Sequence, residues 1–174
     1  MNPYEFLKDN NRTISELQFK LAAHHCNNDI HCIMGKLLDA GLGKITDGLW
    51  VWDLLKNIEL YDQTFRTTLG HKDKSTFPDV PESWQKWIQP ASLKLAMDNF
   101  VKHVESFGKH RYIQEVVYNR PDGTTVTVVC HGIVVAWKEV PKSHRLDYEY
   151  YYEDKDCLQV PLVMVGVHPY KVKK

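Results

Sequence analysis

The sequence has no excess of either charge. Its 174 residues carry 22 lysine and arginine side chains and 22 aspartate and glutamate side chains. A protein that binds nucleic acid mainly through phosphate contacts needs a basic excess or a basic stripe, so we expect no nucleic-acid partner.

Long apolar runs are missing as well. The longest strictly apolar stretch is "IVVAW" at 133–137, which is far shorter than the ~20 residues that cross a bilayer. The N-terminal "MNPYEFLKDNNR" has no apolar segment of the kind that marks a signal peptide. We therefore expect no membrane association and a cytoplasmic location.

Cysteine is scarce, and the chain holds four: Cys26, Cys32, Cys130 and Cys157. They are too few and too scattered for the disulfide framework of a small secreted protein, which favours a reducing setting. A chain of this length buries enough surface for one stable domain without a disulfide or a metal.

The first part of the chain has the apolar spacing of helices. Leu17 and Leu21 are followed by Ile30, Ile33 and Leu37, while "NND" at 27–29 interrupts the pattern. Residues 13–40 are therefore predicted to form one bent helix or two short ones. We assign residues 1–44 to an N-terminal helical cap that also serves dimerisation.

The rest of the chain alternates between short strands and helices before it becomes β-rich. "LWVWDLL" and "NIELY" are predicted strands, and "DQTFRTTLG", "SWQKWI" and a longer segment from Pro90 are predicted helices. Two more strands meet at the Asp-Gly turn of "RPDG", and "PLVMVGVHPY" is the last strand. The polar, tyrosine-rich insertion at 139–159 either extends the hairpin or forms a flap.

Both faces of the late strands are apolar, so the sheet needs cover on both sides. Helices within residues 62–107 can cover one face, and residues 13–40, or a second subunit, can cover the other. Val126, Val128, Cys130 and Val134 are predicted on one face, and Val129, Ile133, Val135 and Trp137 on the other.

Several of these stretches, in this order, resemble a PAS domain of the subgroup rich in bacterial sensor proteins. They are "GLWVWD", "LYDQTFRTTLG", "WQKWIQP", "RPDGTTVTV" and "VMVGVH", which together cover about residues 45–139 and 160–168. The resemblance implies an α+β fold. Its five-stranded antiparallel sheet would have helices on one face and the N-terminal helical cap on the other, with the PAS core at residues 45–170.

The resemblance also implies a function. It points to a sensory or protein–protein interaction module rather than an enzyme, with any small ligand held between the sheet and the long helix. Members of the family usually continue into an output domain, whereas this sequence ends in "PYKVKK". We therefore expect a separate signalling partner, and a homodimer formed through the N-terminal helices and the outer sheet face.

Relatives of this family bind flavin or haem, and the sequence bears on both cofactors. A flavin–cysteine adduct is excluded, because "GHKDKSTFPDVP" at 70–81 has no cysteine. His168, Tyr118 and Val128 also stand where flavin-binding relatives have amide side chains, and Trp50 and Trp52 would fill the space of a large ring. Haem would need His103 on the long helix as its axial ligand; the alternative is a partly exposed helix residue. The cofactor, if there is one, stays open.

The inward-facing parity that the resemblance implies gives a set of pocket candidates. They offer a few polar groups among apolar ones, as a small-molecule site does. The alternatives are core polar residues that satisfy one another, or a parity slipped by one residue. A third hypothesis is a small enzyme that uses the polar members Tyr112, Gln114, Tyr118 and His168. The full candidate set is Trp52, Tyr112, Gln114, Tyr118, Cys130, Met164 and His168.

The stretch "HHCNNDIHC" at 24–32 offers a possible metal site. If it is helical, His25, Asp29 and Cys32 lie on one stripe and could bind zinc. The alternative is that the two asparagines break the helix, with Cys26 or Cys32 packed on the sheet and the histidines in solvent.

The tyrosine run "DYEYYYEDKD" at 147–156 is open to two interpretations. It is either a recognition surface, because aromatic side chains are enriched in interface cores, or a strand extension with exposed rings.

Overall fold

A computed structural model describes the backbone of residues 12–169 and the side chains of residues 16–169. Its helices are α2 (Arg12–His25), α3 (Ile30–Asp39), α4 (Gln63–Thr68), α5 (Pro81–Trp87), α6 (Pro90–Glu105) and the 3-10 helix η2 (Lys142–Asp147). Its strands are β1 (Thr46–Asp53), β2 (Ile58–Tyr61), β3 (Tyr112–Asn119), β4 (Thr125–Val140), β5 (Tyr152–Glu153) and β6 (Leu158–Pro169). The residues outside these ranges, which include the ends of the predicted cap and core, are not described.

The strands form one antiparallel sheet in the order β2-β1-β6-β4-β3, with the two-residue β5 paired to β6. The predicted five-stranded antiparallel sheet is therefore confirmed, and β5 is an addition to it. The first and last strands of the chain pair with each other, because β1 lies between β2 and β6.

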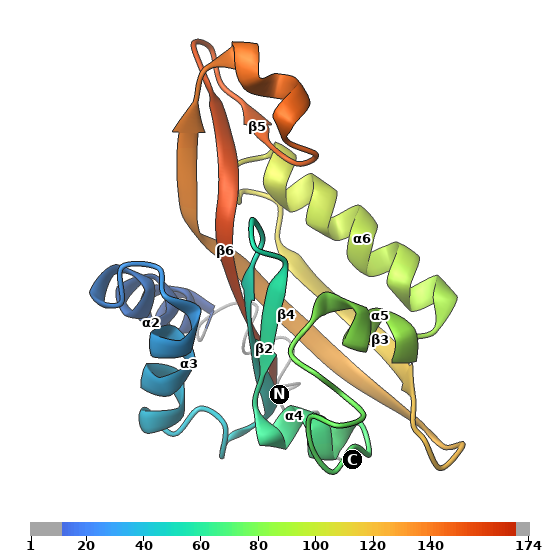
Figure 1. The fold of residues 1–174 in the computed structure, drawn as a ribbon. Coiled ribbons are helices and arrows are strands. Elements are labelled where there is room, and N and C mark those ends of the chain that lie inside the picture. Colours follow the sequence, from blue (N-terminus) through green and yellow to red (C-terminus); the bar gives the residue numbers. More distant parts are fainter. Residues whose placement is uncertain (1–11, 170–174) are drawn as a thin grey trace.

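Helices cover both faces of the sheet, as predicted for an α+β fold of the PAS type (Figure 1). On the inner face, α4, α5 and α6 supply Phe65, Trp84 and Phe100 to the main core. On the outer face, α2 and α3 supply Phe19 and Ile33 to a second core. The chain's own cap thus covers most of the outer face, and no second subunit is needed for that purpose.

Within the described residues the cap has two helices, because the chain turns sharply between them. Asn27 and Asn28 have φ values of 50° and 62°, a left-handed conformation that asparagine tolerates better than most residues. Asp29 then caps α3, accepting a hydrogen bond from the Cys32 backbone N–H at 2.8 Å. This sharp turn brings Cys26 and Cys32 together in a disulfide, which the reducing setting favoured by the cysteine content did not predict.

A β-bulge in β4 changes which residues face the helices. The pairing of β4 with β6 shifts register between Val134 and Trp137, and an extra residue in a strand reverses the parity of the residues that follow. Trp137 consequently packs on the inner core and not on the outer face, where strict alternation predicted it.

The insertion extends the β4–β6 hairpin beyond the sheet. We call residues 141–157 the flap; it contains η2 and β5 and lies beside the C-terminal end of α6 (Figure 1). Tyr150 contacts Phe100 at 4.9 Å between ring centroids. Phe107 lies between Trp137 and Tyr152, at 4.6 and 5.1 Å. These aromatic contacts hold the flap against the core.

Among the helices that the structure describes, none is long and apolar enough to cross a membrane.

Candidate functional site

A small cavity lies between the inner face of the sheet and the helices. Its volume is about 30 Å³, which is room for one or two water molecules. All seven pocket candidates named from the sequence line it: Trp52, Tyr112, Gln114, Tyr118, Cys130, Met164 and His168. The strand register explains this convergence, because Gln114 pairs with Cys130 and Val134 pairs with Met164, and the predicted parity is not slipped.

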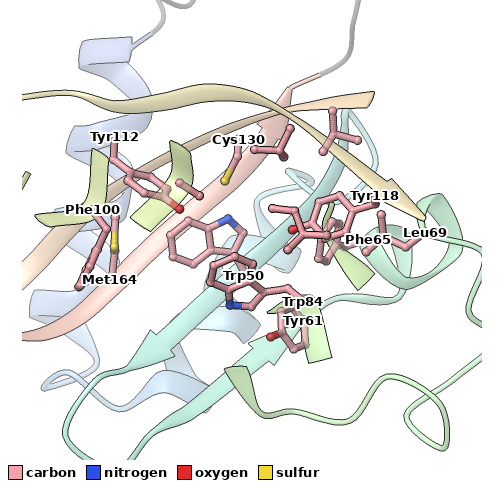
Figure 2. Close-up of a cluster of buried hydrophobic side chains, with 14 of the residues drawn as sticks. Trp50, Tyr61, Phe65, Leu69, Trp84, Phe100, Tyr112, Tyr118, Cys130 and Met164 are labelled. Carbon is pink, nitrogen blue, oxygen red and sulfur yellow. The ribbon is translucent and has the colours of Figure 1, made fainter. Parts of the chain in front are cut away.

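Trp50 lines the cavity and lies in the middle of the surrounding buried side chains (Figure 2), where its indole occupies space between the sheet and the helices. Gly132 and Gly166 pair across β4 and β6, and together they form a flat backbone platform under the indole. A Cβ atom on Gly132 would lie 2.7 Å from the Trp50 ring, and one on Gly166 would lie 1.9 Å from it. Only glycine at both positions leaves space for the ring.

His168 enters the cavity wall from the last strand. Its ring stacks on Phe65 at 4.2 Å with an interplanar angle of 4°, and its Nδ1 lies 3.3 Å from the carbonyl oxygen of Gly48. Burial lowers the pKa of His168 to about 3, so the ring is neutral. Since Nδ1 carries the proton toward Gly48, Nε2 presents a lone pair, and it has no hydrogen-bond partner within the described residues.

Two more side chains leave a buried polar atom without a partner. Asn99 donates a hydrogen bond to Gln114 Oε1 at 3.1 Å, while Gln114 Nε2 finds no partner of good geometry among the described residues. The Trp52 Nε1–H group also lacks a hydrogen-bond partner among the described residues. The Trp52 ring packs on Phe100, with 5.5 Å between the ring centroids. Both atoms are donors, so they complement the acceptor on His168.

Glu59 is the most unusual group at this site. It lies on β2 opposite Trp52 and is 4% exposed. Burial raises the pKa of Glu59 to about 8, although hydrogen bonds with the side chains of Tyr61 and Trp84 partly oppose that effect. The carboxyl group is therefore largely protonated at neutral pH, and its Oε2 has no hydrogen-bond partner among residues 16–169.

The remaining ionisable groups of the cavity are held neutral. Burial raises the pKa of Tyr112 and of Tyr118 well above the ordinary value, and it raises the pKa of the Cys130 thiol to about 12. None of these three is a ready nucleophile or base, and His168 is a weak base. The hypothesis of a small enzyme finds no nucleophile–base pair in this set.

Glu59, Tyr61 and Trp84 also line the cavity, although they were not among the residues predicted from the sequence. For Glu59 a signal was present: the four-residue loop between Asp53 and Ile58 places Glu59 directly opposite Trp52, so an inward Trp52 implies an inward Glu59. Tyr61 follows two residues later on the same face.

His103 lies in the core and not on a partly exposed helix face, with 1% exposure. Its Nδ1 donates to the carbonyl oxygen of His110 at 2.7 Å, and its Nε2 accepts from the Val134 backbone N–H at 3.1 Å. Both ring nitrogens are thus engaged with backbone groups, and the arrangement does not fit an axial ligand of haem.

A flavin does not fit the residues present either. The cavity is more than tenfold smaller than the several hundred Å³ of a cofactor site, and Trp50 lies where a ring would have to stack. Cys130 is the one cysteine in the cavity wall, and it is a neutral buried thiol.

The zinc hypothesis for His25, Asp29 and Cys32 is wrong. It required one continuous helix through residues 24–32, whereas α2 ends at His25 and α3 begins at Ile30. Asp29 caps α3, and Cys32 is bonded to Cys26. Among the described residues, no group of three or more potential metal ligands comes together.

No known protein-family model matches the chain, and no curated protein matches it. Solved structures with a similar fold include a sensory box histidine kinase/response regulator from Burkholderia thailandensis, at 16% identity and a TM-score of 0.49 over 78% of this chain and 84% of that one. A PAS domain of a protein from Colwellia psychrerythraea is 11% identical, with a TM-score of 0.49 over 80% of this chain and 99% of that one.

A PAS domain of an HTR-like protein from Haloarcula marismortui is 16% identical, with a TM-score of 0.43 over 80% of this chain and 92% of that one. At such identities the likeness concerns the fold, and it brings no ligand, activity or partner to this chain.

Proposed function

We propose that this chain is a sensory module of the PAS type that binds a small, uncharged, polar molecule in this cavity. One observation carries the proposal: the side chains of Trp52, Glu59, Gln114 and His168 line one cavity, and Trp52 Nε1, Glu59 Oε2 and His168 Nε2 lack hydrogen-bond partners within the described residues. Gln114 Nε2 has only an interaction with the Tyr112 hydroxyl group that falls short of hydrogen-bond geometry. Buried polar groups without partners are costly, at about 1–3 kcal/mol each. A ligand or bound water that pairs with all four would recover that free energy.

The polar atoms define the chemistry of the ligand. Gln114 and Trp52 donate, His168 accepts, and a protonated Glu59 can do both. No group in the cavity wall carries a full charge at neutral pH, because burial keeps His168 and Glu59 largely neutral. A charged ligand would lose its hydration without gaining a counter-ion. We therefore expect a neutral molecule with donors and acceptors on opposite edges.

Size limits what can enter without rearrangement. The cavity in this structure admits water, and a larger ligand requires Trp50 to leave the platform of Gly132 and Gly166. Such a movement would disturb the packing on both faces of the sheet, since Trp50 pairs with Gly166 in the middle of the sheet. A binding event that moves a central side chain suits a sensor.

Signalling would run through a separate partner or a second copy of the chain. Leu17 and Leu21 lie one turn apart on α2, with 57% and 47% of their surface exposed, and this stripe favours a helix-mediated homodimer. The outer sheet face is already covered by the cap, so the dimer would use the helices alone. A cytoplasmic location stays a prediction, and the Cys26–Cys32 disulfide is a form that a reducing cytosol disfavours.

The test is a ligand screen with a matched control. The full chain would be screened by thermal shift against a library of small uncharged fragments, with native mass spectrometry to detect co-purified ligand. Gln114→Met removes two donors at nearly constant volume and should abolish the shift of every true cavity ligand. Gln18→Met on the exposed face of α2 should leave those shifts unchanged.

If no fragment or co-purified molecule binds, or if hits bind both variants equally well, the proposed site is wrong.

A further inference from the structure

The surface beside the flap has two neighbouring hollows in addition to the cavity described above. The first lies between α6 and the flap, has a volume of about 630 Å³, and is lined by Val101, Val104, Glu105, Tyr150 and Glu153, among others. The second has a volume of about 350 Å³ and lies between the flap and the β1–β2 turn. Glu149 and Tyr150 line both hollows, so the two are adjacent along one surface.

The lining of this surface is acidic, aromatic and apolar. Glu105, Asp147, Glu149 and Glu153 contribute carboxylates, and no lysine, arginine or histidine lines either hollow. The segment 139–159 carries six acidic and three basic side chains in a chain that is neutral as a whole. A local negative excess of this kind selects a cationic partner.

Cations within the chain neutralise part of this charge. Lys142 and Arg145 both pair with Glu153, and His144 lies 3.3 Å from Asp147. No ion pair forms at Glu105 or Glu149 within the part of the chain that is described. These two carboxylates are therefore available to a cation from outside.

The position of Glu105 is electrostatically unfavourable for the helix that carries it. It is the last residue of α6, where the C-terminal end of the helix dipole repels a negative charge. A carboxylate at this position reduces stability, so its presence is better explained by a cation that contacts it. Glu149 is held in place by a hydrogen bond with the Tyr150 hydroxyl group.

The apolar lining suits the stems of basic side chains. Lysine and arginine lay their methylene chains along apolar surface and keep the charged end in water, and tyrosine faces attract cations. Val101 and Val104 supply such a surface in the first hollow, and Leu54 and Leu55 supply it in the second. Leu55 is 51% exposed, and the fold gives no reason for that exposure.

We infer that this surface, which runs from α6 across the flap to the β1–β2 turn, binds a basic peptide segment of a partner protein. Lysine or arginine side chains of the segment would contact Glu105 and Glu149, with apolar residues between them in the hollows. The inference does not rest on the cavity ligand, because the residues that line the two hollows, Trp52 apart, do not line the cavity.

The last strand of the described chain leads away from this surface. Strand β6 begins at Leu158 beside the flap and ends at Pro169 at the far end of the molecule (Figure 1). Its 12 residues span about 40 Å. The "KVKK" segment of a second copy remains a competing occupant that the experiment distinguishes.

The experiment measures fluorescence anisotropy of labelled peptides with the full chain. One probe alternates lysine and leucine, and the other alternates glutamate and leucine at the same length. We expect the lysine probe to bind more weakly as salt rises, and the glutamate probe not to bind. The double variant Glu105→Gln/Glu149→Gln should weaken binding about fivefold, whereas the control Asp39→Asn/Glu82→Gln, with two exposed carboxylates removed elsewhere, should not.

Three results would overturn the inference: no binding of the lysine probe, equal binding of both probes, or an equal loss in the control variant. A chain without residues 170–174 addresses the second copy. If its removal abolishes self-association and strengthens probe binding, the natural occupant is a neighbouring copy and not a partner protein.

Discussion

Trp50 and the two glycines beneath it set the volume of the cavity. Because the ring lies within contact distance of both backbones, a single methyl group at either position forces the indole or the strands to move. Overpacking of a filled core costs about 1–3 kcal/mol. The stability of the protein should therefore depend on these small residues as much as on its large ones.

Gly166→Ala should lower the free energy of unfolding by about 1–3 kcal/mol, as measured by urea denaturation. Gly35→Ala is the control: Gly35 lies inside α3 with nothing within 4 Å of the added methyl group, so alanine should stabilise by about 0.5–1 kcal/mol. Trp50→Leu should relieve part of the Gly166→Ala defect. Independent, additive effects of these two changes would contradict the contact.

Glu59 should make stability fall as pH rises through neutrality. Its pKa is about 8 in the folded protein against an ordinary 4.5, so between these values the folded state binds more protons than the unfolded state, and the free energy of unfolding decreases with pH. His168 acts in the opposite sense. Its pKa is lowered to about 3 from 6.5, and its contribution therefore rises with pH between those values.

The two effects oppose each other from pH 4.5 to 6.5, and Glu59 acts without His168 from 6.5 to about 8. Across that upper window we expect the free energy of unfolding to fall by about 1–2 kcal/mol. Urea denaturation at a series of pH values would measure it. Glu59→Gln should remove the slope, and a persistent slope in that variant would assign it to another group.

At the scale of elements, the Cys26–Cys32 disulfide cross-links the turn between α2 and α3. A cross-link of this short loop restricts the unfolded chain and contributes about 2 kcal/mol. Dithiothreitol should lower the free energy of unfolding by that amount. Hydrogen exchange should locate the first loosening in α2 and α3.

The variant Cys26→Ala/Cys32→Ala should be insensitive to the reductant. If dithiothreitol destabilises it equally, the effect comes from Cys130 or Cys157 instead.

Local patterns predicted most helices and strands, because the spacing of apolar residues that distinguishes them involves residues close together in the sequence. The inward parity that the resemblance implied for Tyr112, Gln114 and Tyr118 agrees with the structure, where all three side chains line one cavity. Features that depend on distant pairing were missed. The bulge before Trp137 arises from the register with β6, and the meeting of Cys26 with Cys32 depends on two left-handed asparagines.

At the scale of the whole molecule, the cap is the outer half of the core. Its removal would expose the apolar side chains of Leu49, Val51, Ile133, Val163 and Val165. A chain lacking residues 1–39 should therefore bind the dye ANS and self-associate. A chain lacking residues 1–11, which keeps α2 and α3, should do neither, and similar behaviour of the two would show that the cap is dispensable.

The proposed homodimer is tested at the same scale. Light scattering during size-exclusion chromatography should report two subunits for the full chain. Leu17→Glu/Leu21→Glu places charges on the exposed stripe of α2 and should give one subunit with unchanged stability. A full chain that is monomeric at every concentration would contradict helix-mediated dimerisation.

The platform under Trp50 also constrains how this protein can diverge. Positions 50, 132 and 166 share one volume, so a lineage that gains a side chain at either glycine must first or simultaneously shrink the tryptophan. Homologous sequences should accordingly show these three sites changing in concert. A homologue with a small residue at position 50 and glycine at both 132 and 166 would have an empty, flat space in place of the indole ring, into which a planar ligand could fit.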